Sequence, residues 1–271
     1  MSIAKRDKIA GAIYGFAIGD AMGATTEFMS KEEIKIGYGK VTDIIGGGWL
    51  NLNPGEVTDD TQMSMCVMDA LMKYPLRLGA FENACVENFI KWFQGKPKDV
   101  GGQCAKGINA LRFGKRISVD TQALGNGSLM RAMPCALVNN LTFNISQGKL
   151  THNNLECGKY IQTYSKLLNC YINGDYIDIT TKCLVEPSGH ARNTLNNSIY
   201  WSQKESFKEA LLGAVNDGGD ADTIAAITGS LAGAKFGYSK IPKKWINQLN
   251  LEVKNNLENF KNFVFSYLQI Q

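Results

Sequence analysis

The chain has 271 residues, of which 44% are hydrophobic and 20% charged, a composition typical of folded globular proteins that excludes extended disorder and fibrous structures. Its 29 basic and 25 acidic residues are interleaved and give a formal net charge of only +4, so no nucleic-acid-binding surface is indicated. The length suffices to bury one large apolar core, and we therefore expect a single domain over residues 1–271.

The predicted elements are helices. Apolar residues recur at helical spacing through most of the chain, strand-like alternation is scarce, and only six prolines occur. We therefore predict an all-α fold without linkers or tandem repeats. The expected helices cover residues 4–23, 59–74, 79–94, 100–113, 127–139, 152–171, 175–185, 203–216, 222–237 and 243–269.

The first predicted helix and the predicted helix over 222–237 each carry a ridge of glycines spaced four residues apart. These glycines are Gly11, Gly15 and Gly19 in the first helix and Gly229, Gly233 and Gly237 in the second. Glycines at this spacing let two helix backbones approach closely. We interpret both ridges as packing surfaces rather than as phosphate-binding loops.

A loop with an acidic residue at each end follows the first helix, from Asp20 to Glu27. Glu27 is a candidate for a mobile general acid/base. Taken alone, however, a loop glutamate is more often a solvated surface residue.

The first acidic cluster stands directly before the predicted helix over 59–74 and contains Thr58, Asp59 and Asp60. Thr58 or Asp59 suits the N-cap position, and acids in a first turn favour the helix dipole, so a purely structural role explains a lone T-D-D sequence. Two adjacent carboxylates flanked by hydroxyls are also suitable ligands for a hard cation.

A glycine-rich turn over residues 125–128 is predicted to open the helix over 127–139 and could present backbone N–H groups to an anion such as a pyrophosphate. The polar segment over residues 139–149 that follows indicates no particular structure or function.

The second acidic cluster, over residues 217–223, again precedes an apolar helix. Asp222 or Thr223 could simply cap that helix. Asp220 and Asp222, however, are separated by one residue and follow two permissive glycines, so both carboxylates can face one point. The spacing is not that of an EF-hand. Oxygen ligands without His or Cys favour Mg²⁺ or Mn²⁺ over Zn²⁺.

Taken together and in order, these segments resemble the ADP-ribosylglycohydrolase family, in particular its dinitrogenase reductase-activating branch. The resemblance covers nearly the whole chain. It rests on G-x-x-x-G-x-x-x-G-D from Gly11, T-D-D-T from Thr58, W-F-x-x-x-P-K-D-V-G from Trp92, G-N-G-S-x-M-R from Gly125, T-H-N-N from Thr151, G-G-D-A-D-T from Gly218, and G-S-L-A-G-A-x-x-G-x-x-x-I-P-x-x-W from Gly229.

The resemblance implies a helical globule with a central cleft and a binuclear Mg²⁺ or Mn²⁺ centre, in an enzyme that hydrolyses the bond between ADP-ribose and a modified group. The implied metal ligands are Thr58, Asp59, Asp60, Asp220, Asp222 and Thr223. The implied catalytic residues are Glu27 and Asp60, and the implied substrate-binding residues are Gly125, Asn126, Gly127, Ser128 and His152. Leu155 replaces the proline that usually follows the family's T-H motif, which puts the shape of that turn in doubt.

The leaving group is not fixed by the motifs. We expect ADP-ribosyl-arginine on a protein, with Asp99 pairing with the guanidinium, although Asp99 could equally cap a helix. The alternatives are O-linked ADP-ribose, on serine or as an acetyl ester, and a binding or structural member without turnover. Expected partners are an ADP-ribosylated protein or small-molecule conjugate, without nucleic acid or membrane, and the chain is expected to be a monomer.

The cysteines and the N-terminal sequence predict a cytoplasmic location. The seven cysteines are scattered and lack C-x-x-C pairing, which is typical of buried thiols in a reducing compartment. Gly19 and Asp20 interrupt the apolar run that starts at Ile9, so we expect no signal peptide. No segment reaches the roughly 20 apolar residues of a membrane-spanning helix.

Overall fold

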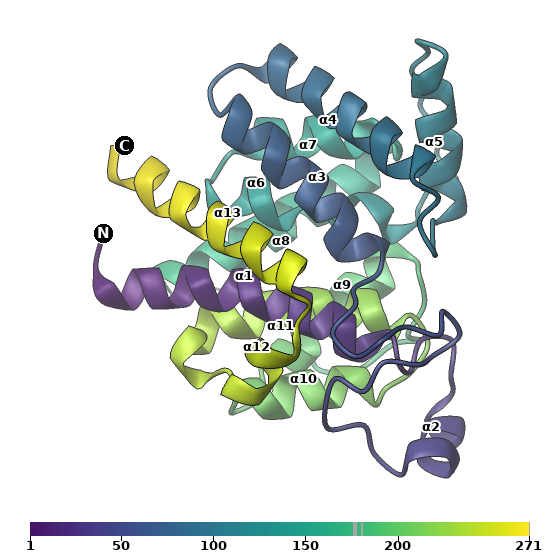
Figure 1. The fold of residues 1–271 in the computed structure, drawn as a ribbon, viewed down its shortest axis with the longest axis vertical. Helices are drawn as coiled ribbons and strands as arrows, with labels where there is room; N and C mark the ends of the chain where they lie inside the picture. The colour runs from purple at the N-terminus through teal and green to yellow at the C-terminus, as the bar shows by residue number, and fades with distance from the viewer. Residues whose placement is uncertain (176–177, 180, 271) are drawn as a thin grey trace.

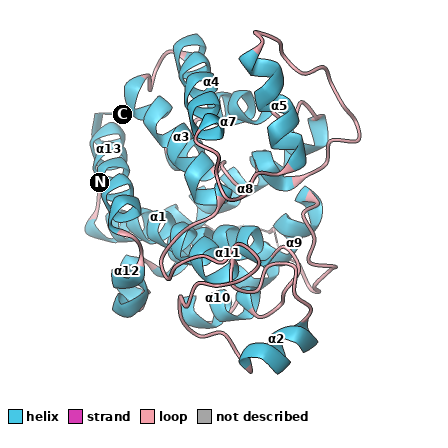
Figure 2. Ribbon diagram, turned by 45° about the vertical axis from the view of Figure 1, so that its right-hand side comes forward, coloured by secondary structure: helices cyan, strands magenta, loops and turns pink. Residues whose placement is uncertain are grey.

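The structure of the chain, a computed structural model, describes residues 1–175, 178–179 and 181–270. The described residues form thirteen α-helices and no β-strand (Figures 1 and 2), which confirms the all-α prediction. The helices are α1 (Ile3–Gly23), α2 (Lys31–Tyr38), α3 (Asp59–Lys73), α4 (Leu78–Gln94), α5 (Gly102–Arg112), α6 (Met133–Leu137), α7 (Leu141–Lys149), α8 (Leu155–Asn173), α9 (Ala191–Ser202), α10 (Phe207–Val215), α11 (Ala221–Phe236), α12 (Lys243–Gln248) and α13 (Leu251–Ile270). Two 3-10 turns are η1 (Asn126–Ser128) and η2 (Tyr238–Lys240).

Helices α1 and α11 pack against each other in the middle of the fold (Figure 1). Gly11 lies against Gly233 and Gly15 against Gly229, so the two helices run antiparallel. A side chain added at Gly15 would collide with the backbone of Gly229. The interpretation of both ridges as packing surfaces is therefore confirmed for these pairs. The antiparallel pairing brings the end of α1 to the start of α11, and this is where the acidic clusters meet.

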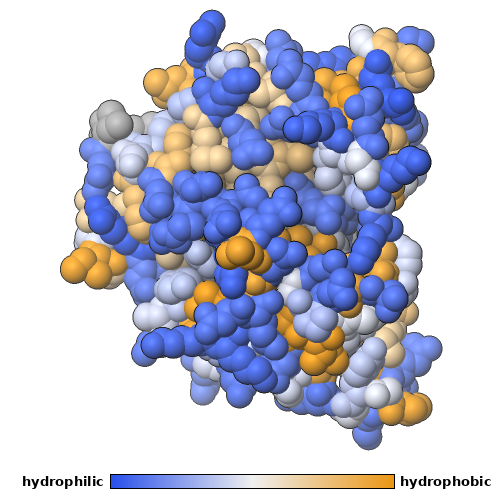
Figure 3. Space-filling view, in the orientation of Figure 1, coloured by the Kyte–Doolittle hydropathy of each residue, from blue (hydrophilic) through white to orange (hydrophobic). Residues whose placement is uncertain are grey.

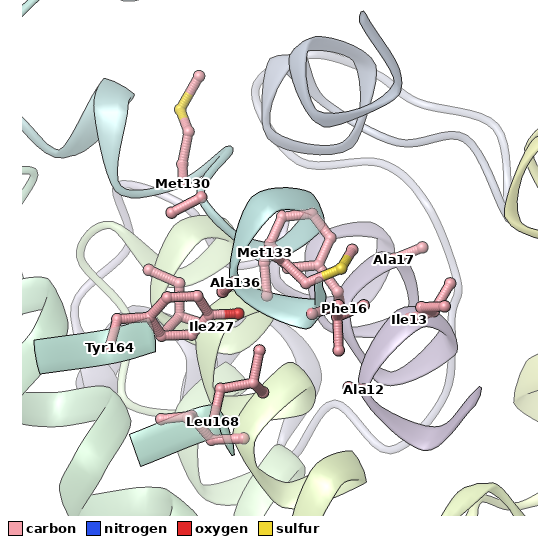
Figure 4. Close-up of a cluster of buried hydrophobic side chains, with 14 of the residues drawn as sticks. Ala12, Ile13, Phe16, Ala17, Met130, Met133, Ala136, Tyr164, Leu168 and Ile227 are labelled. Carbon is pink, nitrogen blue, oxygen red and sulfur yellow. The ribbon is translucent and has the colours of Figure 1, made fainter. Parts of the chain in front are cut away.

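The apolar core surrounds this helix pair. Figure 4 shows residues from several helices in one buried cluster, among them Phe16, Met133, Tyr164, Leu168 and Ile227. On the face shown in Figure 3, hydrophilic residues cover most of the surface and apolar groups are scattered. None of the helices in the described ranges is both long enough and apolar enough to cross a membrane.

The predicted helix over 127–139 is wrong for most of its length. The chain forms the short turn η1 and enters a helix only at Met133. The Gly127 carbonyl, which would accept the Arg131 amide in an α-helix, accepts the Arg131 guanidinium instead at 2.6 Å. Asn139 then adopts a left-handed backbone, with φ +53°, where the segment ends.

The predicted helix over 243–269 is interrupted. Helix α12 ends at Gln248, and the amide of Asn250 donates to the Gly55 carbonyl at 3.0 Å instead of continuing the helix. The side chain of Asn250 then caps α13 by accepting the amide of Glu252 at 2.9 Å.

Three helices were not predicted, namely α2, α7 and α9. A capping box between Ser30 and Glu33 begins α2. The His190 side chain accepts the amide of Arg192 at 3.1 Å and caps α9. Conversely, no helix forms at 175, 178–179 or 181–185, where one was predicted, and residues 176–177 and 180 lie outside the described part.

The seven cysteines are unpaired in the described structure. Cys85, Cys104, Cys135 and Cys157 are buried as expected, whereas Cys183 is exposed, so the prediction of buried thiols is wrong at that position.

Candidate active site

The first acidic cluster is held in place by Asp20, a fully buried residue in the last turn of α1. Thr58 is the N-cap of α3, and its hydroxyl accepts the amide of Asp60 at 3.3 Å. The Asp20 carboxylate accepts the amides of Thr58 and Thr61, each at 3.0 Å. These amides belong to the helix start, where the backbone offers no acceptor. Asp20 therefore fixes the start of α3 against the end of α1.

The second acidic cluster is shaped by its two glycines. Gly218 and Gly219 have φ values of +76° and +63°, a left-handed conformation that other residues adopt only with strain. Asp220 follows as the N-cap of α11, but its side chain makes no capping bond. It accepts instead from Asn126 Nδ2 at 2.5 Å. Asp217 pairs with Lys31 at 2.5 Å and is not part of the group described next.

The two clusters converge, as predicted. Carboxylate oxygens of Asp59, Asp60 and Asp222 all lie within 4.8 Å of one another, and those of Glu27, Asp220 and Asp222 do so as well. Asp222 belongs to both groups. The Thr223 hydroxyl also donates to Asp60 Oδ2 at 3.2 Å, which links α11 directly to α3.

The donor set fits hard divalent cations. Each of the two groups consists of carboxylates alone, which are the ligands that Mg²⁺ and Mn²⁺ prefer. Asp60 Oδ1 and Asp222 Oδ1 are buried and have no hydrogen-bond partner. Because a buried unpaired carboxylate oxygen is costly, these two atoms fit direct contact with a cation. Asp222 is shared by the two groups.

Burial and mutual repulsion keep protons on these carboxyls in the metal-free chain. Burial, reinforced by Asp99, raises the pKa of Asp59 to about 8. Burial raises the pKa of Glu27 to about 8, against the opposing effect of the Trp49 hydrogen bond. The pKa values of Asp60 and Asp222 are raised well above the ordinary range, by burial first and then by the neighbouring acids.

Divalent-cation binding is therefore expected to tighten as the pH rises from about 6 to about 8. Asp59, whose pKa is about 8, holds a proton at the lower pH, and a protonated ligand must lose its proton to bind an ion. We expect the apparent Kd for Mn²⁺ to fall at least ~10-fold over this range, with proton release. Calorimetry in buffers of different ionisation enthalpy measures the Kd and the number of protons released. An unchanged Kd without proton release would contradict the claim that burial and mutual repulsion keep protons on these carboxyls in the metal-free chain.

A cleft of about 260 Å³ opens onto the carboxylates. Of the residues that the sequence indicates, it is lined by Glu27, Asp59, Asp60, Asp99, Gly125, Asn126, Gly127, His152, Asp220, Asp222 and Thr223. Thr58 and Ser128 are buried and do not line it. The Ser128 side chain lies against Gly148, on the interior side of its turn.

A buried arginine orients the glycine-rich turn that lines the cleft. Arg131 is fully buried and donates to the Gly127 carbonyl at 2.6 Å and to Thr151 Oγ1 at 2.8 Å. Thr151 Oγ1 in turn lies 2.9 Å from His152 Nδ1. Burial and the charge of Arg131 lower the pKa of His152 to about 3, so the imidazole is neutral. Because Thr151 accepts from Arg131, its own proton is available to Nδ1, an arrangement that favours the N–H on Nε2, beside Gly125 and Gly127.

Several residues near the site were not singled out from the sequence as functional. Asp20 was noted only as a loop acid, and Arg131 only as part of a motif. Trp49 was not noted, yet its Nε1 donates to Glu27 Oε2 at 2.6 Å. The one sequence signal for Trp49 is its place after three consecutive glycines, which is unusual for a large apolar side chain.

Comparison with known proteins agrees with this geometry. The family model for ADP-ribosylglycohydrolase matches residues 1–184 and 177–268. The ADP-ribosyl-dinitrogen-reductase glycohydrolase of Rhodospirillum rubrum is 34% identical over 277 residues, with 93% of each chain covered. ADP-ribosylarginine hydrolase Tri1 of Serratia proteamaculans (strain 568) is 29% identical over 288 residues, covering 90% of this chain and 75% of the relative.

A solved structure described as an ADP-ribosylglycohydrolase-related protein complex superposes with a TM-score of 0.81 at 25% sequence identity, covering 98% of both chains. The similarity therefore extends over the whole fold.

Proposed function

The chain belongs to the ADP-ribosylglycohydrolase family of hydrolases, and from this premise we propose that it releases ADP-ribose from modified arginine side chains of proteins, with Mg²⁺ or Mn²⁺ as cofactor. The observation that carries the proposal is the convergence of buried carboxylates from α3 and α11, two of which have an unpartnered oxygen. In this proposal one domain, residues 1–271, provides the complete site.

The proposed ligands are Thr58, Asp59, Asp60, Asp220, Asp222 and Thr223. Two divalent ions bound there would hold the ribose hydroxyls and supply Lewis-acid stabilisation of charge. Asp220 is already oriented by Asn126, and Asp60 by the hydroxyls of Thr58 and Thr223. These bonds keep the carboxylates facing the cleft before any ion binds.

Glu27 is the proposed proton carrier. In hydrolysis the bond between the ribose anomeric carbon and the arginine nitrogen breaks, a water oxygen bonds to that carbon, and a proton passes to the departing nitrogen. Glu27 is only 4% exposed, and Trp49 fixes one of its oxygens. A carboxyl in this position, beside Asp220 and Asp222, can accept a proton from water and return one to the leaving group. The neutral His152 and the turn over residues 125–127 are the proposed pyrophosphate and ribose contacts, whereas Ser128, which the resemblance also implied, does not line the cleft.

The relatives support arginine as the leaving group. One similar protein is described as an ADP-ribosylarginine hydrolase and another as acting on ADP-ribosyl-dinitrogen reductase. Incubating the purified chain with arginine-, serine- and acetyl-linked ADP-ribose, with and without Mn²⁺, tests the proposal. We expect Mn²⁺-dependent release of ADP-ribose from the arginine adduct. Rapid cleavage of an O-linked adduct with an intact arginine adduct would contradict it.

Asp99 is the residue that we expect to recognise the charge of the leaving group. It lines the cleft beside Asp59, and a carboxylate suits the planar, permanently charged guanidinium. Asp99→Asn should lower kcat/KM for the arginine adduct about 10- to 100-fold, because a hydrogen bond to a charged group contributes about 1.5–3 kcal/mol. Metal content should stay unchanged. A variant that loses metal instead would assign Asp99 to the ligands.

A further inference from the structure

Two aromatic side chains stand exposed beside the carboxylates. Phe28 is 65% exposed and lines the cleft, and Trp49 is 52% exposed. Their ring centroids are 5.3 Å apart, with the ring planes inclined at 47°. Because adjacent exposed aromatic rings do not contribute to the core, such a pair beside a cleft points to binding.

The backbone at Phe28 is strained and is fixed to the second acidic cluster. Phe28 has a φ of +63°, a conformation that is unfavourable for a bulky residue. Its amide donates to the Gly219 carbonyl at 2.6 Å, and the Gly219 amide donates to the Met29 carbonyl at 2.9 Å. These bonds hold the Phe28 ring beside the loop that carries Asp220. Because the Phe28 side chain is exposed, packing does not explain this backbone strain. Strained backbone conformations are common at functional sites.

Trp49 connects the aromatic pair to the reacting end of the cleft. Its indole N–H donates to Glu27 Oε2, so the edge of the Trp49 ring lies directly beside the proposed proton carrier. The leaving group departs from this same place, since Glu27 delivers a proton to it.

The charge of the cleft indicates what the pair would contact. Six carboxylates line the cleft, from Glu27, Asp59, Asp60, Asp99, Asp220 and Asp222, and no Lys or Arg is found among the described residues of its lining. Two divalent ions would carry four positive charges, so at full ionisation the site would remain negative. A planar cation is favoured both by this residual charge and by an aromatic face.

We infer that Phe28 and Trp49 form the subsite for the leaving group and stack against the guanidinium of the modified arginine, an inference that rests on the proposed arginine substrate. The pair thereby recognises the part of the substrate that ADP-ribose itself lacks. Phe28 supplies the ring that faces the cleft, and Trp49 supports it while fixing Glu27.

The test separates the ring from the hydrogen bond. Phe28→Leu keeps apolar bulk but removes the aromatic face, and should lower kcat/KM for arginine-linked ADP-ribose about 5- to 30-fold. Trp49→Phe and Trp49→Ala both lose the N–H bond to Glu27, but only Trp49→Phe keeps a ring. We expect Trp49→Ala to be a further ~5-fold or more below Trp49→Phe. Phe113→Ala, at a residue 76% exposed and outside the cleft, is the matched control.

The dissociation constant for ADP-ribose, which has no leaving group, is the reference measurement. It should stay within about 2-fold of wild type in all four variants. The subsite assignment is overturned if Phe28→Leu has the wild-type kcat/KM for the arginine adduct. It is also overturned if the affinity of the variant for ADP-ribose falls as much as its kcat/KM. The proposed function stands in both cases. A wild-type chain that does not cleave the arginine adduct would overturn both.

Discussion

Asp222→Ala is expected to lose both metal and turnover. Asp222 is the only carboxylate that belongs to both described groups, so its removal should affect both ions. Because even outer-shell substitutions weaken metal affinity by about 10–100-fold, loss of a direct shared ligand should weaken it by more than about 100-fold, with activity falling at least as far. Elemental analysis after dialysis, together with ADP-ribose release, measures the two effects.

The fold should survive this substitution. Burial and the neighbouring acids raise the pKa of Asp222 well above its usual range, so in the metal-free chain this carboxyl destabilises the folded state increasingly above about pH 4, where the unfolded chain already ionises it. The chelator-treated variant should therefore unfold at a temperature no lower than chelator-treated wild type near pH 8. Asp69→Ala, on the exposed face of α3, is the control and should keep its metal. A folded Asp222→Ala variant with a full metal complement would refute the ligand assignment.

Glu27→Gln is expected to retain metal and lose turnover. Glutamine preserves the shape of the side chain and an acceptor for the Trp49 N–H but cannot carry a proton. The expected loss in kcat is about 10²–10⁴-fold, the usual contribution of a general acid/base. Glu27 also lies within the carboxylate group that includes Asp220 and Asp222, so metal analysis is needed to separate the two roles. Metal loss equal to that of Asp222→Ala would make Glu27 a ligand instead of a proton carrier.

The convergence of the acidic clusters could be predicted because each cluster precedes an apolar helix and both offer the same kind of oxygen ligands. The reason for the convergence could not be predicted from the sequence. The ridges at Gly15 and Gly229 indicate close packing, but only the structure shows that they pair antiparallel and bring the end of α1, where Asp20 holds the start of α3, to the start of α11. Partner choice between two similar ridges is a long-range property that local spacing does not contain.

The segment over residues 139–149 was uninterpretable because two of its polar residues, Asn144 and Gln147, are fully buried. Gln147 Oε1 accepts from Arg131 Nε at 2.7 Å, and Asn144 Nδ2 donates to the Ala132 carbonyl at 2.9 Å, both within the protein. Helix α7 thus supports the glycine-rich turn through Arg131, and its polar character is the consequence. Sequence patterns assign polar residues to the surface, so a buried polar helix gives the wrong signal.

The aromatic pair was missed for a related reason. Phe28 and Trp49 lie in irregular segments, where helical periodicity gives no information about exposure. The positive φ of Phe28 is also invisible in the sequence, because Gly, Asn and Asp are the residues that normally mark such a conformation.

Activity followed during metal titration tests the central claim most directly. Chelator-treated protein is titrated with Mn²⁺ at about pH 8, while bound metal and the release of ADP-ribose from the arginine adduct are recorded together. We predict no release without metal and a rise that saturates when two ions are bound per chain. Full activity in the presence of chelator, or saturation without any ion bound to the wild-type chain, would contradict the role assigned to the converging carboxylates.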